Sequence, residues 1–123
     1  MKAAKLQDMG TEELVDSFVN ICLAQDEALL DDEVVKFNRL FDKMHAIVEE
    51  LRARAGDQRR ALLPLYKHSN LQVRLKAATN TFAVAPDEAQ RLLRMIADSG
   101  EYPQAGEAGM TLVNIERGIF KPV

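Results

Sequence analysis

The chain has 123 residues, of which 47% are hydrophobic and 28% charged, and its formal net charge is −3. This balance fits a single folded domain spanning residues 1–123 and excludes a disordered chain. The few Gly and Pro residues fall mainly between apolar runs, which is typical of an all-helical protein.

A long helical hairpin is predicted over residues 11–55. Its first helix is expected to begin with Thr11 as the N-cap. No Gly or Pro marks the break before the second helix, so the break is placed at Asp31 or Asp32, either of which can cap a helix. The core positions expected in the first helix are Leu14, Phe18, Ile21 and Cys22.

The second helix has the strongest periodic pattern in the chain and is expected to end at Gly56. Its apolar stripe steps by three and four residues through Val34, Phe37, Phe41, Met44, Val48 and Leu51. This stripe offers more apolar surface than six short helices need, so a homodimer formed through this helix is an open alternative.

Two shorter helix pairs are predicted over residues 57–119. Asp57 is expected to cap the third helix, and Pro64 to kink it because proline lacks an N–H. Ser69 and Gln72 form a capping-box pattern before the fourth helix.

The fifth helix is expected to open with Pro86 at its first position, and the sixth to run from about Gly106 to near Gly118. The inward positions expected in these two helices are Ala89, Leu92, Leu93, Ile96, Ala108, Leu112, Ile115 and Ile119.

The two pairs form an internal repeat. The dipeptide at 62–63 aligns with the one at 92–93, and the small residues Ala77 and Ala78 align with Ala108 and Gly109. A helix pair repeated every ~30 residues is typical of an α-solenoid, and small residues let neighbouring helices approach closely.

The stretch LLPLYKHSNLQVRLKAATNTF resembles a HEAT-like repeat through its Val-Arg pair and the small residues that follow. The resemblance implies a structural role for Arg74, with Asp57 or Asp98 as its partner. The second repeat lacks a matching arginine. The fold expected is an α-α superhelix of HEAT-like type, with about six helices in antiparallel pairs.

The whole chain also resembles a family of small bacterial proteins known as domain of unknown function 2019. The segments that carry this likeness are TEELVDSFVNICLAQDEALL, KFNRLFDKM, GDQRRALLPLY and YPQAGEAGM. The resemblance implies a HEAT-like superhelix and no established activity.

Catalytic and metal-binding chemistry has little support in the sequence. His45 with Asp42 and Glu49 shares one helix face, but a surface cluster explains this spacing better than a metal site does. Cys22 lies on an apolar stripe and is expected in the core. No phosphate loop, nucleophile elbow or zinc spacing occurs, so we expect no enzyme, no metal and no cofactor.

The lone cysteine excludes an internal disulfide and fits a reducing compartment. No apolar run reaches the ~20 residues of a membrane span, and the opening MKAAKLQDMG has no apolar signal-peptide core. We therefore expect a cytoplasmic protein with no membrane partner.

The function expected is a non-enzymatic protein-protein interaction module of regulatory or immunity-like type, whose partner is another protein. By analogy with solenoids, the second helices of the pairs are expected to line a concave face. Their outward residues, the candidate contacts, are Lys76, Asn80, Thr111 and Asn114.

Nucleic-acid binding is the alternative function. Residues 34–76 hold ten bases and four acids, whereas residues 1–33 hold nine acids and two bases. The candidate basic patch consists of Arg52, Arg59, Arg60 and Lys67. The net negative charge and the absence of Trp make nucleic acid the less favoured partner.

Overall fold

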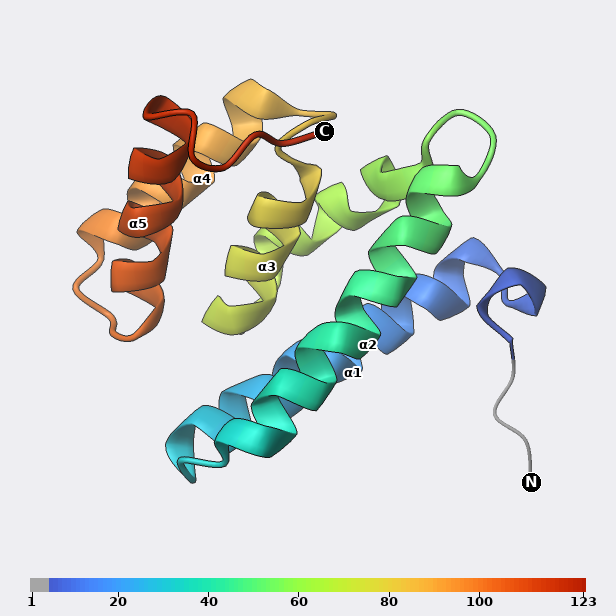
Figure 1. The fold of residues 1–123 in the computed structure, drawn as a ribbon, viewed down its shortest axis with the longest axis horizontal. Helices are drawn as coiled ribbons and strands as arrows, with labels where there is room; N and C mark the ends of the chain where they lie inside the picture. The colour runs from blue at the N-terminus through green and yellow to red at the C-terminus, as the bar shows by residue number, and fades with distance from the viewer. Residues whose placement is uncertain (1–4) are drawn as a thin grey trace. The chain divides into compact units, whose positions relative to one another are not determined.

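The structure, a computed structural model, describes residues 5–123. These residues form five α-helices and two 3-10 helices and contain no strand, which confirms the all-α prediction (Figure 1). The elements are η1 Leu6–Asp8, α1 Thr11–Leu30, α2 Val34–Ala53, η2 Gln58–Lys67, α3 Leu71–Thr81, α4 Pro86–Asp98 and α5 Gln104–Glu116.

The chain divides into two compact units, Met1–Ala61 and Leu62–Val123, and each is described by itself. Their boundary lies within η2, four to six residues after the predicted division at 55–57. The organisation of residues 1–123 as one domain stays a prediction. Within the described residues, no helix has both the length and the apolar composition needed to cross a bilayer.

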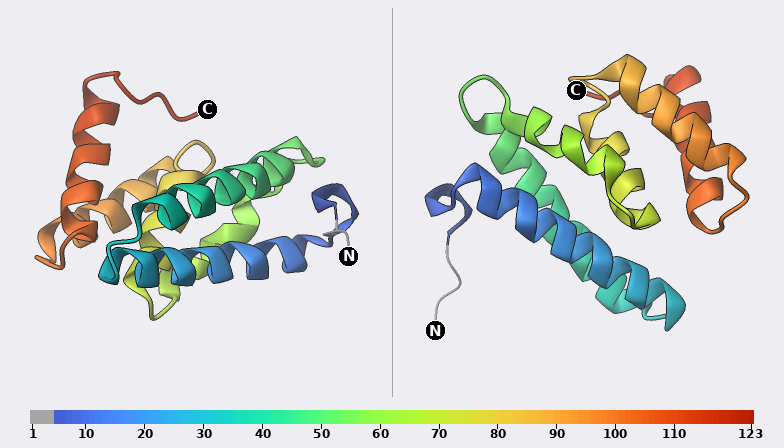
Figure 2. Two further views of the ribbon diagram at one scale, coloured as in Figure 1. Left: turned by 60° about the horizontal axis from the view of Figure 1, so that its bottom comes forward. Right: turned by 180° about the vertical axis from the view of Figure 1, so that it is seen from behind.

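The first unit is built on the predicted hairpin, in which α1 and α2 lie side by side and run in opposite directions (Figure 2). The turn lies where the sequence places it, because Asp31 caps the end of α1 and Asp32 adopts a left-handed conformation with φ 55°. Aspartate tolerates that conformation better than most residues do. Buried side chains along the hairpin are Leu14, Phe18, Cys22, Ala28, Met44, Ile47, Val48 and Leu51.

The start of α1 differs from the prediction by one residue. Gly10 is the N-cap, and its backbone N–H donates to Glu13 Oε1 at 3.1 Å. The Thr11 hydroxyl bonds instead to the Gln58 side chain. Thr11 is therefore the first residue of the helix, and its side chain serves a long-range contact rather than the cap.

The predicted third helix is a 3-10 helix, η2, rather than an α-helix. Asp57 does not open an α-helix as its N-cap, because its backbone is left-handed, with φ 53°. Pro64 lies inside η2, where its missing N–H removes a hydrogen bond that an α-helix would need. The tighter, shorter-range bonding of a 3-10 helix accommodates both features.

Helix α3 begins one residue later than the capping box suggested. The side chain of Asn70, not Ser69, accepts the hydrogen bond from the Val73 N–H at 3.1 Å. Gln72 is buried and bonds to Gln104 instead of closing a capping box. Asparagine and serine are comparable N-caps, so local sequence did not separate them.

The second unit packs α4 against both α3 and α5 around one apolar cluster. The cluster consists of Leu75, Ala78, Leu92, Leu93, Ile96, Ala108 and Leu112. Pro86 occupies the first turn of α4, as predicted. Helix α5 begins at Gln104, two residues earlier than expected, and is capped by Arg117, next to the predicted stop near Gly118.

Two predicted core positions near the end of α5 differ. Ile119 is exposed, because Gly118 adopts φ 72° and turns the chain out of the helix. Ile115 is only partly buried.

The small residues of the repeat lie at close helix contacts. Ala77, Ala78 and Ala108 are fully buried. At Gly109, however, an added Cβ would lie 4.0 Å from the Ala97 Cβ, which is ordinary contact. A small side chain therefore suffices at position 109, and glycine itself is not required.

Candidate functional site

The most exposed apolar surface of the first unit lies at the turn of the hairpin. We call residues 26–41 the hairpin tip; they form the end of the hairpin at which α1 passes into α2 (Figure 2). Leu30 is 82% exposed, Val35 72%, Val34 62% and Phe41 48%. Single exposed apolar residues are ordinary, but a cluster of this kind marks an interaction surface.

The exposed residues follow from the period of α2. Val34, Phe37 and Phe41 continue the stripe that buries Met44 and Val48 further along the same helix. The sequence indicated that this stripe offers more apolar surface than the helices of one chain need. Near the tip the stripe is left uncovered, and Val34 and Phe41 are exposed.

A small hollow lies within the hairpin tip. Its volume is about 120 Å³, which suits one aliphatic side chain and is far below the size of an ordinary small-molecule site. The residues that line it are Ala28, Leu29, Asp32, Glu33, Val34 and Phe37. Four of these residues are apolar and two are acidic.

The charge of the hairpin tip has one sign near the turn. Between residues 26 and 33 there are five acids and no base. The acids are Asp26, Glu27, Asp31, Asp32 and Glu33. At 100° per residue, Lys36, Arg39 and Lys43 lie on the side of α2 opposite Val34 and Phe41. Lys36 and Arg39 also line a second, open depression together with Asp32, Glu33, Val34 and Val35, so both signs of charge are present at the hairpin tip.

The predicted contact residues of α3 and α5 lie along a polar seam, which we call the α3–α5 seam. Lys76 was expected to point outward, but it is buried, and its Nζ lies 2.5 Å from Glu107 Oε2. Beside this ion pair, Gln104 Nε2 donates to Gln72 Oε1 at 3.2 Å. The two helices approach so closely that their facing polar groups satisfy each other.

The remaining predicted contacts are partly buried rather than projecting. The Asn80 amide donates to the Lys76 carbonyl at 2.9 Å, and the Thr111 hydroxyl donates to the Glu107 carbonyl at 2.9 Å. Asn114 is also partly buried. These side chains are engaged by their own helices, which weakens the case for a binding face at the seam.

The structure removes Arg59 from the candidate basic patch. Its guanidinium is buried and forms two hydrogen bonds to Asp57, from Nε at 2.8 Å and from Nη2 at 2.6 Å. The hydrogen bond from Arg59 holds the pKa of the Asp57 carboxyl below its ordinary value. The same bond raises the pKa of Arg59, so the pair is ionised and internally neutralised.

The other members of the patch are divided between the units. Arg52 lies 3.9 Å from Glu49, and Arg60 is exposed in the first unit, whereas Lys67 is exposed in the second.

Arg74 does not form the pair with Asp57 that was one of its two expected contacts. The buried Nε of Arg74 has no hydrogen-bond partner among residues 5–123, and Asp57 pairs with Arg59 instead. His45 is exposed, and the described part of the chain brings together no cluster of three or more metal-ligating side chains. Cys22 is buried, as predicted.

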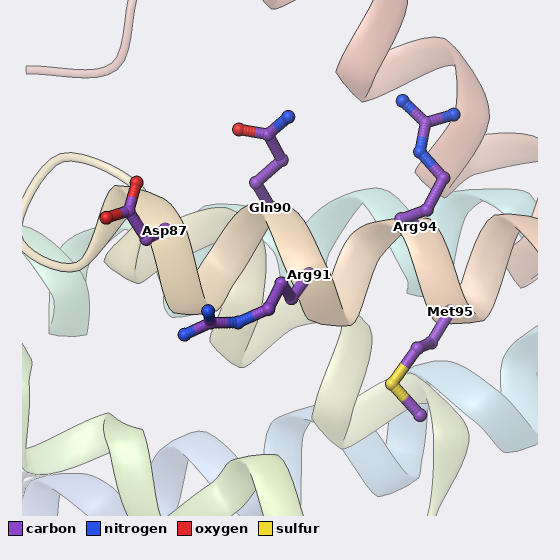
Figure 3. A pocket seen from close by; sticks show the side chains of 5 residues that line it. All are labelled: Asp87, Gln90, Arg91, Arg94 and Met95. Atoms are coloured by element: carbon purple, nitrogen blue, oxygen red, sulfur yellow. The ribbon is translucent and has the colours of Figure 1, made fainter.

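The outer face of α4 carries a second surface that sequence reasoning overlooked. An open depression of about 480 Å³ is lined by Asp87, Gln90, Arg91, Arg94 and Met95 (Figure 3). The five residues are spaced by one or three positions, and this spacing places them on one face of the helix. The sequence indicated this surface, because polar residues fill the positions of the helix that lie outside its apolar stripe at 89, 92, 93 and 96. Its charges are mixed, and Arg91 lies 3.9 Å from Glu88.

The all-helical fold of residues 5–123 places the chain among small all-α proteins. The chain belongs to the domain of unknown function family DUF2019, whose model matches residues 12–116. It is similar to the crystal structure of the protein RPA1889 from Rhodopseudomonas palustris CGA009. The two are 48% identical, and the match covers 98% of this chain and 100% of that one, with a TM-score of 0.94. No curated protein matches the chain.

Proposed function

We propose that this protein is a non-enzymatic protein-binding module whose binding surface is the hairpin tip. The observation that carries the proposal is the exposure of Leu30 and Val34 at the turn of the hairpin, where Val34 also lines a hollow of about 120 Å³. A regulatory or immunity-like role in the cytoplasm is part of the proposal, with another protein as the partner.

Burial of these side chains supplies a driving force for association. Each Å² of apolar surface removed from water contributes roughly 25 cal/mol, and fully burying one valine or leucine contributes about 1.5–3 kcal/mol. Leu30 and Val34 supply such apolar surface at the hairpin tip, and binding energy in protein interfaces concentrates in a few residues of this kind.

A HEAT-like arrangement of the second unit is the architectural part of the proposal. Two features support it: the repeated small residues at 77–78 and 108–109, and the contact between α3 and α5, which hold equivalent places in the repeat. In this arrangement the second unit is a rigid scaffold and the hairpin carries the recognition surface.

Capture experiments with the tagged full chain test the proposal. We expect one host protein, identified by mass spectrometry, to be recovered by the wild type and lost with the double variant Leu30→Ser/Val34→Ser. The purified prey should then rebind the purified wild-type chain at a one-to-one ratio. Both substituted residues are exposed, so far-UV circular dichroism should show an unchanged helix content.

A matched variant separates the alternative function. Arg60→Glu combined with Lys67→Glu alters the exposed bases and leaves the hairpin tip intact. If capture is lost with this variant and retained with Leu30→Ser/Val34→Ser, the proposal is wrong. Recovery of nucleic acid alone, with strong salt dependence, would lead to the same conclusion.

A further inference from the structure

We infer that the outer face of α5, formed by Tyr102, Gly106, Met110 and Val113, pairs with the same face of a second copy of this chain, the two helices running antiparallel. This surface shares no residue with the hairpin tip, so the inference goes beyond the proposed function. It combines an apolar helix face with opposite charges at the two ends of that face.

The side of α5 that faces away from the core is apolar. The inner side of the helix packs against α4 and supplies Ala108 and Leu112 to the apolar cluster (Figure 1). Between residues 104 and 115 the exposed positions are Gly106, Met110 and Val113. They recur every three or four positions, so they share one face of the helix, and none of them is polar.

Tyr102 extends this face beyond the start of the helix. The residue is 74% exposed, and a Cβ added at Gly106 would lie 3.6 Å from Tyr102 Cδ1. The tyrosine ring therefore lies beside Gly106, between which and Met110 the helix backbone is open to a close approach. An exposed apolar patch of this kind marks a surface that another molecule covers.

The outer face of α4 gives a comparison within the same unit. Four of the five residues that line the depression on α4 are polar, and Met95 is the one apolar residue among them. Solvated helix faces have such a composition, in which single exposed apolar side chains are ordinary. The outer face of α5 lacks these polar side chains, so its composition is that of a covered face.

Two exposed charges of opposite sign lie at the ends of the outer face of α5. Glu101 precedes the helix and Arg117 follows it. Among residues 5–123, neither side chain has an ion-pair partner. At about 1.5 Å per residue, roughly 18 Å of helix separates the two, so they cannot pair within one chain. Glu116 points about 100° away from Arg117 around the helix and thus lies off this face.

An antiparallel pair of α5 helices brings these opposite charges together. With the two-fold axis beside Met110, Val113 of each copy faces Gly106 of the other, and Arg117 of each copy faces Tyr102 and Glu101 of the other. The pairing therefore places a valine where glycine leaves space and forms two ion pairs. A two-fold interface requires a surface that is complementary to itself, and this order of acid, apolar residues and base supplies it.

The size of the face predicts a weak dimer. Interfaces that bury less than about 1,200 Å² in total belong to transient complexes, and two single helix faces stay within that class. We therefore expect the dimer to form at high protein concentration and to dissociate on dilution.

Sedimentation velocity of the full-length chain between about 10 µM and about 1 mM tests the inference, because weak complexes dissociate in this range. Met110→Glu should lower the association constant about tenfold or more, because it places a carboxylate in an apolar interface. Met95→Glu is the matched control, since Met95 is 69% exposed and Met110 60%. It should leave association unchanged. Far-UV circular dichroism should show wild-type helix content in both variants.

Charge reversal tests the antiparallel arrangement. Glu101→Arg and Arg117→Glu should each weaken association, because each brings like charges together between the two copies. The double variant Glu101→Arg/Arg117→Glu restores both ion pairs with the charges exchanged, so its association should return toward that of the wild type. Because the two residues are too far apart to pair within one chain, this rescue reports a contact between copies.

Several outcomes would overturn the inference. They are a chain that stays monomeric at every concentration, equal effects of Met110→Glu and Met95→Glu, and a double charge variant that associates no better than the single ones. Loss of the dimer with Leu30→Ser/Val34→Ser, but not with Met110→Glu, would assign self-association to the hairpin tip and also overturn it. The capture experiment decides the proposed function independently, because it uses substitutions in the hairpin tip.

Discussion

Lys76 and Glu107 form an ion pair across the α3–α5 seam, with Nζ 2.5 Å from Oε2. The two partners are unequally placed, because only 8% of the lysine side chain is exposed, against 41% of the glutamate side chain. The glutamate can be hydrated when the pair is broken, whereas the lysine ammonium is left in the seam. The two partners should therefore respond differently to removal.

We expect Glu107→Ala to lower the free energy of unfolding by about 2 kcal/mol, because it leaves a buried cation without its carboxylate. Lys76→Met should cost less than half as much, since methionine fills the same space without a charge. Urea unfolding followed by circular dichroism measures both. A larger loss for Lys76→Met than for Glu107→Ala would contradict this account, and Glu116→Ala, exposed on the same helix, is the control.

Arg54 fastens the segment before α1 to the end of α2. Its Nη2 donates to the carbonyls of Leu6 and Met9 at 3.1 and 2.6 Å, and its Nε donates to Glu50 at 2.9 Å. Lysine lacks the planar fork needed for these simultaneous bonds. Arg54→Lys should therefore accelerate hydrogen exchange of the amide of Met9, which bonds to the Leu6 carbonyl.

The control for this prediction is Arg52→Lys. Arg52 lies two residues earlier on α2 and lies 3.9 Å from Glu49 at the surface. Its replacement should leave exchange near Met9 unchanged. Equal effects from the two variants would show that Arg54 does not fasten this segment.

The Asp57–Arg59 pair predicts a pH dependence of stability. Because Arg59 lowers the pKa of Asp57 in the folded state, the pair stabilises the protein fully above pH 3.8, which is the ordinary pKa of the carboxyl. The contribution is lost as the pH falls from there through the folded pKa. The difference in unfolding free energy between wild type and Asp57→Asn should be constant above this range and shrink below it.

Asparagine keeps the left-handed backbone of position 57, so this substitution isolates the charge. Asp98→Asn, at an exposed position, is the matched control. A difference between wild type and Asp57→Asn that grows as the pH is lowered would refute the assignment.

The burial of Tyr66 predicts a second pH dependence of stability, at alkaline pH. Its half-buried phenol bonds to the Thr81 hydroxyl, and burial raises the pKa of Tyr66 above 10.0. The neutral phenol therefore stabilises the fold below pH 10.0, and this contribution is lost as the pH rises through the raised pKa of Tyr66.

The chain has two tyrosines, so Tyr102→Phe leaves Tyr66 as the only phenol to titrate. We expect its absorbance midpoint above 10.0 in the folded chain, returning toward 10.0 in concentrated urea. Identical midpoints in the two conditions would contradict the burial of this group in the folded state.

The helical periods of the sequence were sufficient to predict where most helices lie. The inward positions of α4 and the position of the break at Asp31 and Asp32 are confirmed, because each depends on local pattern. The expectation that one of these aspartates caps the second helix is wrong, since the N-cap of α2 is Glu33 and no side chain caps it. Burial depends in addition on what covers a stripe. The length of the stripe indicated an excess of apolar surface, but not which residues would be left exposed, because the stripe continues unchanged from Val34 and Phe41 into the buried part of α2.

The contacts that the sequence predicted least well are those between side chains distant in sequence. Three of the bonds of Arg54, to Thr11, Leu6 and Met9, reach residues 43–48 positions earlier, and no local pattern around Arg54 indicates them. The pair of Lys76 with Glu107 was within reach, because these residues are 31 positions apart, the same offset that aligns Ala77 with Ala108. Equivalent positions on adjoining helices of a repeat are natural neighbours.

The conformation of η2 shows a different limit. Its apolar pattern fits an α-helix, but the left-handed backbone at Asp57 and the proline at position 64 favour the 3-10 form. The choice between the α and 3-10 forms depends on small differences in backbone energy. The spacing of apolar residues carries no information about these differences.

The central claim is that the hairpin tip binds a protein through its apolar hollow. Its most direct test is the affinity of the captured partner for purified Val34→Ser and Val35→Ser chains, measured by isothermal titration calorimetry. We predict that Val34→Ser binds about tenfold more weakly than wild type and that Val35→Ser binds like wild type. Equal, undiminished affinity in both variants would contradict the account.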